Sequence, residues 1–231
     1  MTKRNARIIG VVYLFFFLTS ILSDRFLKAL VVQNDAQTTA TRILTHESLF
    51  RLGVATGLVD TAFYVALVAL LYDLFKPVNR RVSFVAALFG IVGCAIQGSG
   101  STFELFSLVV LKGGVAVAEF KAEQLPGLAL LSLRLNDQAV GVALVFFAVY
   151  CLLIGCLILG STFLPRFLGV LMFLAGLGWL TFLYAPLADR LSPYIEVLGV
   201  VAEVSLMLWL LVMGVNAERW QDQAKRAGSS P

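Results

Sequence analysis

Six long runs of apolar residues, separated by short polar segments, dominate the pattern of this chain. The hydrocarbon core of a bilayer takes about 20 residues of helix, and each run reaches that length. We therefore predict six membrane-spanning helices, over residues 8–30, 49–74, 82–111, 140–159, 164–184 and 194–215. Helices satisfy their own backbone groups in lipid, so the predicted fold class is an all-α, polytopic transmembrane helix bundle with about six spans.

Two of the predicted outer connections contain short helical patterns of their own. Residues 35–45 follow Asn34, which we expect to cap a helix. Residues 125–135 are apolar but too few to cross a bilayer. We expect both segments to be amphipathic helices outside the membrane, with an extension of the fourth span as the alternative for residues 125–135. Residues 216–231 would form a short cytoplasmic tail, so that residues 1–231 make a single transmembrane domain.

The third predicted span carries the polar groups around which we expect the bundle to be organised. Gln97, Ser101 and Glu104 are four and three residues apart, so they share one face of a helix. Beside that face, small residues recur at every fourth position: Ala86, Gly90, Cys94, Gly98 and Thr102. Small residues let a neighbouring helix approach closely in lipid, and polar residues there need protein or water partners. This span is therefore predicted to be central.

Small residues also recur on three other predicted spans. They are Gly53 and Gly57 on the second, Gly141, Ala148 and Gly155 on the fourth, and Gly169 and Gly176 on the fifth. Each set predicts a close helix–helix contact. The contact is expected inside the chain, or in a homo-oligomer built through these glycine-rich faces.

Composition and charge support a membrane protein. Hydrophobic residues make up 59% of the chain and charged residues 14%, with a mean hydropathy of +0.89. Soluble domains average about 45–50% apolar and about 25% charged residues, so the bilayer is the expected partner of the apolar surface. We attribute the net charge of +4 to the orientation of the protein in the membrane rather than to nucleic-acid binding, because basic residues gather in short segments between spans: Lys76, Arg80, Arg81 and Arg166. This predicts that both termini are cytoplasmic.

Five stretches carry a resemblance to a known family. They are SLFRLG at residues 48–53, KPVNR at 76–80, GVALVFF at 141–147, LPRFLGV at 164–170 and EVSLMLWLL at 203–211. In this order and spacing the chain resembles the bacterial membrane family called domain of unknown function 4386, from about residue 7 to residue 215. The resemblance implies a multi-pass protein of the cytoplasmic (inner) membrane with six to seven spans. It implies no activity, because the function of that family is unassigned.

Three acidic residues fall inside predicted spans: Asp60, Glu104 and Glu203. An ionised carboxylate at the membrane centre costs at least about 2.5–3.5 kcal/mol, so it needs a partner or a proton. Measured from the cytoplasmic helix ends, Asp60 lies about 21 Å deep and Glu203 about 18 Å, at a rise of roughly 1.5 Å per residue. At one level, the two could face each other and share a proton. Glu104 would lie near the outer boundary.

These residues suggest an outward-open polar pocket between the second, third and sixth spans. Its floor would be Asp60, Gln97 and Glu203, and Glu104 would lie nearer the mouth. The secondary candidates are Arg51, Tyr64, Ser101 and Asp137. The alternative is that the acids are protonated or hydrogen-bonded contacts that hold the helices together.

Several kinds of chemistry are not indicated. We predict no catalytic residue, no metal site and no cofactor, because the chain has one histidine, His46, and no nucleotide-binding or nucleophile-elbow motif. The three cysteines, Cys94, Cys151 and Cys156, lie inside apolar spans and are read as packing residues.

Three function classes stay open. The first is binding or transport of a small, partly apolar molecule or a lipid, coupled to protons through Asp60 and Glu203. The second is a structural or accessory membrane subunit whose acids are hydrogen-bonded and which has no pocket. The third is an intramembrane enzyme that uses the carboxylates as acid and base. An enzyme is less favoured than the other two, and the pattern identifies no ligand.

Overall fold

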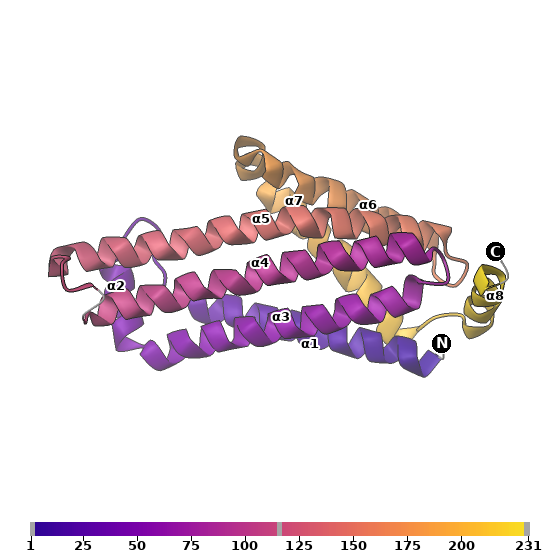
Figure 1. The fold of residues 1–231 in the computed structure, drawn as a ribbon, viewed down its shortest axis with the longest axis horizontal. Helices are drawn as coiled ribbons and strands as arrows, with labels where there is room; N and C mark the ends of the chain where they lie inside the picture. The colour runs from indigo at the N-terminus through magenta and orange to yellow at the C-terminus, as the bar shows by residue number, and fades with distance from the viewer. Residues whose placement is uncertain (1–2, 115–116, 229–231) are drawn as a thin grey trace. The chain divides into compact units, whose positions relative to one another are not determined.

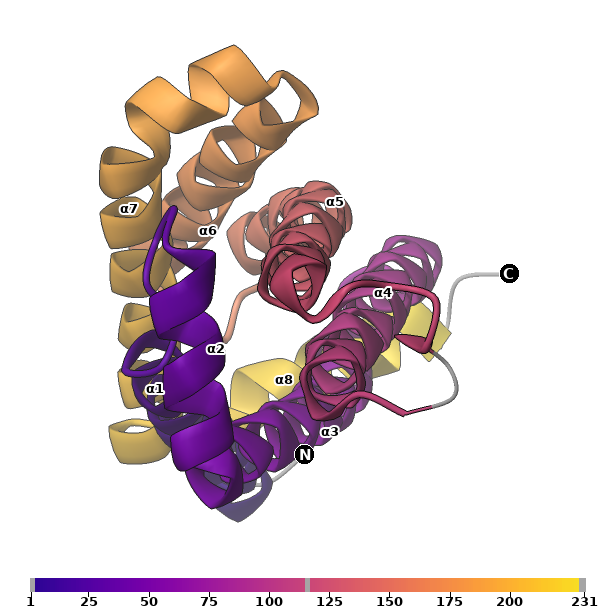
Figure 2. The same ribbon diagram turned by 90° about the vertical axis from the view of Figure 1, so that its left-hand side faces the viewer.

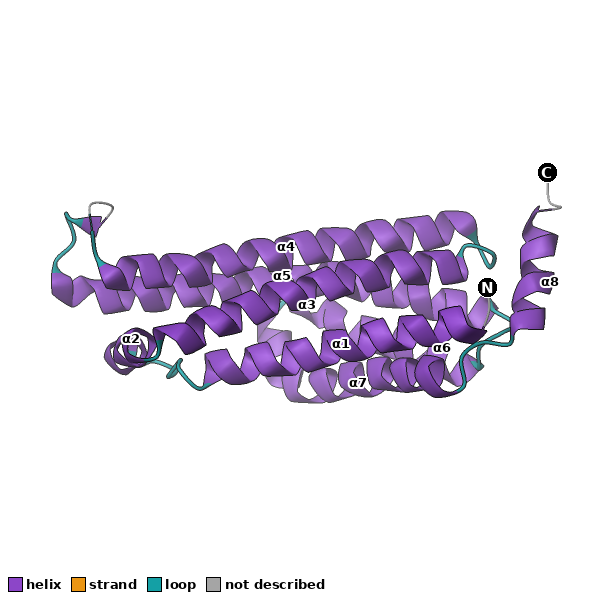
Figure 3. Ribbon diagram, turned by 90° about the horizontal axis from the view of Figure 1, so that it is seen from below, coloured by secondary structure: helices purple, strands orange, loops and turns teal. Residues whose placement is uncertain are grey.

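A computed structural model describes residues 3–114 and 117–228. Within these residues all regular structure is helical (Figure 3). The elements, in order, are α1 (Lys3–Lys28), α2 (Ala36–Thr45), α3 (Glu47–Phe75), α4 (Arg80–Lys112), η2 (Ala122–Gln124), α5 (Leu125–Gly160), α6 (Arg166–Trp179), η3 (Leu180–Leu183), α7 (Ala185–Val212) and α8 (Ala217–Gly228). Six of these segments are long and apolar enough to cross a membrane. The predicted all-α, polytopic fold class is confirmed.

The segment 125–135 is not a separate surface helix. It forms the first part of α5, which runs without a break for 36 residues. Its two helix breakers, Pro126 and Gly127, both fall in the first turn, where a proline is tolerated. Leucine and alanine, which favour helix, dominate the residues that follow up to Asn136, so the helix continues into the span. The structure therefore has the alternative arrangement, an extension of the fourth span.

Helix α2 begins one residue later than expected. Its N-cap is Asp35, whose side chain accepts a hydrogen bond of 2.9 Å from the backbone N–H of Thr38. Asn34 instead adopts a left-handed conformation with φ of +62°. Its side-chain oxygen accepts a bond of 2.6 Å from Arg134. The expected cap at Asn34 is thus corrected to Asp35, since Asn34 makes the turn that precedes the helix.

Two helices near the C-terminus also differ from expectation. Helix α7 begins at Ala185, nine residues before the predicted residue 194, and continues through Pro193. The region expected as a tail contains α8, which has a strongly polar sequence and one tryptophan, Trp220. The indole N–H of Trp220 donates to the carbonyl oxygen of Leu74 at 2.9 Å, so α8 is attached to the end of α3.

The chain forms two compact units. Unit 1 comprises Met1–Phe15, Phe63–Cys94 and Val142–Pro231, and unit 2 comprises Phe16–Ala62 and Ala95–Gly141. Helices α1, α3, α4 and α5 contribute to both units, whereas α6, α7 and α8 belong to unit 1 and α2 belongs to unit 2.

Glycines bring the helices of unit 1 together. Helices α6 and α7 lie side by side (Figures 1 and 2). A Cβ at Gly199 of α7 would lie 2.4 Å from the ring of Trp179, and one at Gly155 of α5 would lie 2.9 Å from the carbonyl oxygen of Gly169. Such distances leave no room for a side chain, so these glycines form seams inside the chain.

Unit 2 combines one close helix contact with an apolar cluster. The hydroxyl of Ser23 on α1 donates to the carbonyl oxygen of Gly53 on α3 at 2.9 Å. A Cβ at Gly57 would lie 3.0 Å from the same hydroxyl oxygen, so small residues hold α1 against α3. One cluster of buried apolar residues in this unit comprises Leu30, Ile43, Phe50, Val54, Leu108 and Leu133.

Large apolar side chains stay exposed along the spans. Leu52, Phe84, Val109, Phe167 and Val200 are each about half exposed. A surface of this extent would be unfavourable in water and is suited to lipid. The molecule is thus a multi-pass helical membrane protein.

Candidate functional site

Asp60 on α3 is the most buried acid of unit 2, with 4% of its surface exposed. The hydroxyl oxygen of Thr19 on α1 lies 3.4 Å from its Oδ1, and the same hydroxyl donates to the Phe16 carbonyl oxygen at 3.0 Å. The side-chain amide of Gln97 on α4 donates to its Oδ2 at 3.5 Å. Both distances exceed the usual hydrogen-bond range, so these contacts are weak, and both groups are neutral. The structure thus brings the predicted pair Asp60 and Gln97 together and adds Thr19 from a third helix.

The position of Thr19 follows from the small residues near it. Ser23 and Thr19 are one turn apart on α1, and Gly57 and Asp60 are about one turn apart on α3. Because α1 and α3 run in opposite directions and meet at Ser23 and Gly57, the next turn places Thr19 at Asp60. The sequence carries a signal for this, the hydroxyl residues Thr19, Ser20 and Ser23 within the apolar first span, but the predicted site did not include Thr19.

Glu104 on α4 is the second buried acid of unit 2, with 8% exposed. Its Oε1 accepts a hydrogen bond of 3.2 Å from the side-chain amide of Asn136 on α5. Gly100 makes room for this amide, since a Cβ there would lie 2.5 Å from Asn136 Oδ1. Four residues before Asn136, the Ser132 hydroxyl donates to the Phe103 carbonyl oxygen at 2.6 Å. Asn136 was also absent from the predicted site, although it lies four residues after a serine that interrupts an apolar segment.

Asp137 is exposed and lies within electrostatic range of Glu104. It also interacts with the cations Arg134 and Lys28. Ser101 is half-buried on α4 between Gln97 and Glu104. Polar groups therefore follow one another along one face of α4, from Gln97 beside Asp60 to Glu104, which is close to the exposed Asp137.

Arg51 pairs with Glu47 rather than with Asp60 or Glu104. Its Nε lies 2.8 Å from Glu47 Oε1, and Lys112 Nζ lies 2.6 Å from the same oxygen. The side chain of Arg51 is half exposed. Arg51, Glu47 and Lys112 thus form a cluster of ion pairs between the start of α3 and the end of α4.

Glu203 belongs to unit 1 and has an aromatic environment. It is half-buried on α7, forms a side-chain hydrogen bond with Tyr13 of α1, and interacts with Cys151. Tyr64, also within its electrostatic range, packs edge-on against Tyr150 with ring centroids 6.2 Å apart. The Tyr150 hydroxyl is buried without a hydrogen-bond partner in the described part of the chain.

The sequence pattern pointed to Glu203 and Tyr64 but not to the other members of this cluster. Tyr13 and Tyr150 each stand alone in an apolar run, and Cys151 was read as a packing residue. Because Asp60 and Glu203 belong to different units, a proton shared between them stays a prediction.

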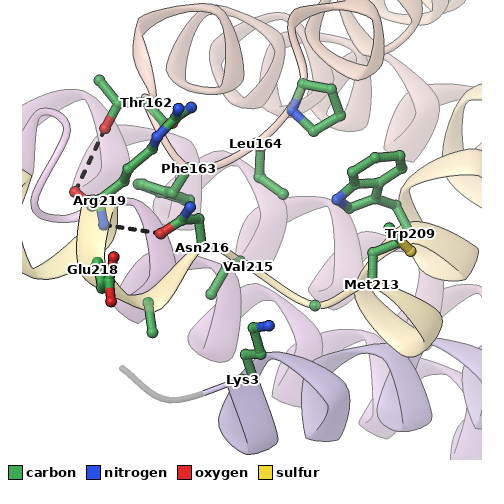
Figure 4. A pocket seen from close by; sticks show the side chains of 13 residues that line it. Lys3, Thr162, Phe163, Leu164, Trp209, Met213, Val215, Asn216, Glu218 and Arg219 are labelled. Carbon is green, nitrogen blue, oxygen red and sulfur yellow. Dashed lines mark hydrogen bonds between the residues drawn. The ribbon is translucent and has the colours of Figure 1, made fainter.

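Two pockets, of about 620 and about 810 Å³, open beside α8 in unit 1, and Figure 4 shows the smaller of them. None of the eight predicted site residues lines either of them. Among residues 3–114 and 117–228, no three His, Cys, Asp or Glu side chains converge as metal ligands would.

The sequence of the spans matches a family profile. Residues 8–214 match the family described as domain of unknown function (DUF4386), from the first turns of α1 to the turn after α7. The chain belongs to the DUF4386 family. The resemblance carried by the five short stretches is thereby confirmed.

A relative of this DUF4386 protein is an uncharacterized protein of Archaeoglobus fulgidus. It is 28% identical over 153 residues, which cover 65% of this chain and 76% of the relative. No solved structure matches the chain. The DUF4386 match includes all eight predicted site residues and ends before α8. Family membership therefore agrees with a multi-pass helical membrane protein and brings no activity.

Proposed function

We propose that the protein binds a small, partly apolar molecule within the membrane and moves it across, and that Asp60 gains or loses a proton in the process. The observation that carries this proposal is the environment of Asp60. The carboxyl is buried, and both of its oxygens face neutral donors, Thr19 and Gln97, at 3.4 and 3.5 Å.

Neutral donors suit a carboxyl that changes its charge. A carboxylate paired with lysine or arginine keeps its charge, whereas one held by a hydroxyl and an amide is stable in either form. The cost of an ionised acid at the membrane centre is at least about 2.5–3.5 kcal/mol, and acids kept there commonly relay protons or bind a substrate. Asp60 therefore has the surroundings of a proton-binding group.

The polar face of α4 supports a route for that proton. Gln97 and Glu104 are seven residues apart, two helical turns or about 10 Å. Ser101 lies between them, and Asn136 and the exposed Asp137 follow on α5. These groups form a series in unit 2 from the buried acid to an exposed one.

The second candidate is an accessory subunit without a ligand. It is favoured by two observations. Glu104 is hydrogen-bonded to Asn136, as a structural acid would be, and the two pockets beside α8 are not lined by any of the predicted acids.

The test is a binding screen in lipid nanodiscs with amphipathic weak acids, amines and neutral compounds. Binding is measured as thermal stabilisation, and proton exchange as the pH change of a weakly buffered solution. We compare wild type with Asp60→Asn and with a matched control on the same helix, Asp73→Asn, an exposed acid paired with Lys76. We expect about one proton exchanged per bound molecule in wild type and in the control, and none in Asp60→Asn.

Equal proton exchange in Asp60→Asn and wild type would contradict the role of Asp60. A different result would favour the accessory function: no compound stabilises the wild type, and a second membrane protein co-purifies with it in equal amount and stabilises it.

A further inference from the structure

Helix α8 forms one wall of both pockets in unit 1. Four residues, Thr162, Leu164, Pro165 and Arg219, line both of them, so Arg219 stands where the two meet. At Gly214, with φ of +68°, the chain leaves α7 in a left-handed conformation and turns towards α8.

Several hydrogen bonds besides that of Trp220 hold this wall in place. Gln223 accepts from the backbone N–H of Thr162 at 3.0 Å and donates to the carbonyl oxygen of Gly160 at 3.2 Å. The guanidinium of Arg219 donates to the carbonyl oxygen of Thr162 at 3.4 Å. The position of Arg219 is therefore set by α8 and by the loop between α5 and α6.

The smaller pocket has an apolar end and a polar end. Figure 4 shows Trp209 and Met213 at one end and Arg219 with Thr162 at the other. Trp209 lies near the end of the span α7, and Met213 follows that span. Tryptophan at the end of a span is typical of the membrane–water boundary, so the apolar end is placed to meet acyl chains.

The charge of the two pockets is positive. Lys3 and Arg219 line the smaller pocket with one acid, Glu218. Arg166, Arg219 and Arg226 line the larger pocket, again with one acid, Asp222. Within the described ranges, Lys3, Arg166 and Arg219 form no ion pair. The guanidinium of arginine is well shaped to bind phosphate oxygens.

We infer that this pair of pockets binds the phosphate head group of an anionic phospholipid. Arg219 contacts the phosphate, Lys3 and Arg166 flank it, and the acyl chains leave past Trp209 and Met213. Free phosphate esters share the charged group but lack the apolar part that the Trp209 end suits. Basic pockets at the ends of membrane spans recognise anionic head groups in this way. The inference is independent of the proposed function, because Asp60 belongs to unit 2.

The experiment uses the full chain in detergent micelles that contain phosphatidylglycerol or phosphatidylcholine. Lipid retention is measured by native mass spectrometry and stabilisation by thermal unfolding. We expect phosphatidylglycerol to be retained preferentially. Arg219→Gln should weaken its retention about fivefold, the contribution of one basic residue beside an anionic membrane surface. Arg219→Lys should retain part of the binding, because it keeps the charge but not the bidentate geometry.

The matched control is Arg81→Gln, which removes the same charge from unit 1 at a residue that lines neither pocket. It should retain phosphatidylglycerol as wild type does. If Arg219→Gln detaches α8 and unfolds the protein, Lys3→Gln replaces it, since Lys3 lies on α1.

Three results would overturn the inference. They are equal retention of phosphatidylcholine and phosphatidylglycerol by the wild type, an equal loss in Arg81→Gln, and displacement of the lipid by inorganic phosphate alone. The last result would assign the site to a free phosphate ester.

Discussion

The contact between α5 and α6 in unit 1 makes the stability effect of Gly155→Ala predictable. A Cβ at Gly155 would lie 2.7 Å from the backbone nitrogen of Phe173, 2.9 Å from the carbonyl oxygen of Gly169 and 3.0 Å from the Cα of Phe173. Favourable non-bonded contacts between carbon atoms lie at about 3.5–4.0 Å. All three atoms belong to the main chain of α6, so no side chain can rotate away and the helix itself must move.

The magnitude follows from this geometry. Overpacking of a well-packed interior costs about 1–3 kcal/mol. Because the atoms that the new Cβ meets belong to the backbone, we expect the clash in Gly155→Ala to cost an amount near the middle of that range. Alanine also favours helix over glycine by about 0.5–1 kcal/mol, which opposes the clash. In the control Gly127→Ala, on the same helix, the added Cβ has no atom within 4 Å outside the adjacent backbone of its own helix, among the residues that the structure describes. The difference between the two variants isolates the clash, and we expect about 2 kcal/mol, or about 30-fold in the unfolding equilibrium.

The assay is reversible unfolding by dodecyl sulfate in mixed micelles, followed by circular dichroism and by the fluorescence of the tryptophans. Wild type, Gly155→Ala and Gly127→Ala are measured under the same conditions. If Gly155→Ala is as stable as Gly127→Ala, α5 and α6 do not meet at Gly155, and the packing argument for this seam is refuted.

Two further predictions concern the ends of the helices. Trp220→Phe keeps an aromatic ring but removes the indole N–H that donates to the Leu74 carbonyl, and should destabilise the attachment of α8 by about 1 kcal/mol, seen as faster proteolysis of the C-terminus. An unchanged cleavage rate would contradict the attachment. Hydrogen bonds from Thr38 hold the pKa of the Asp35 carboxyl below its usual range. This stabilisation is therefore present above the unfolded pKa of roughly 4 and is lost as the pH falls through the folded pKa. Asp35→Asn keeps a capping side chain that does not titrate. The unfolding free energy of this variant relative to wild type, measured by denaturant titration at a series of pH values, should therefore rise as the pH falls. A difference that stays constant with pH would refute the prediction.

The hydropathy pattern was sufficient to predict the class of protein and the number of spans. Twenty or more apolar residues have one stable form in lipid, which is a helix, so length alone identifies the spans. Helical spacing was also sufficient to place Gln97 and Glu104 on one face of α4. The continuity of α5 was predicted only as an alternative, because the sequence of an amphipathic segment beside a span is the same whether the chain bends away or continues as a helix.

Only the tertiary structure decided the partners of the buried acids. Thr19 meets Asp60, Asn136 meets Glu104, and Tyr13 meets Glu203. Each partner comes from a helix that is distant in sequence. Periodicity shows which residues share a face, but it does not show which helix that face contacts.

The physical reason lies in the solvent. In water, an apolar face must be buried against protein, and the pattern therefore marks the interior. In a bilayer, lipid and a neighbouring helix are equally apolar, so apolar residues face either one. Phe167 and Leu168 are both apolar, and residue type alone does not tell which of them faces a neighbouring helix. The first is exposed and the second is fully buried. Composition determined that this protein lies in a membrane, and only the fit of small residues and hydrogen bonds determined how its helices pack.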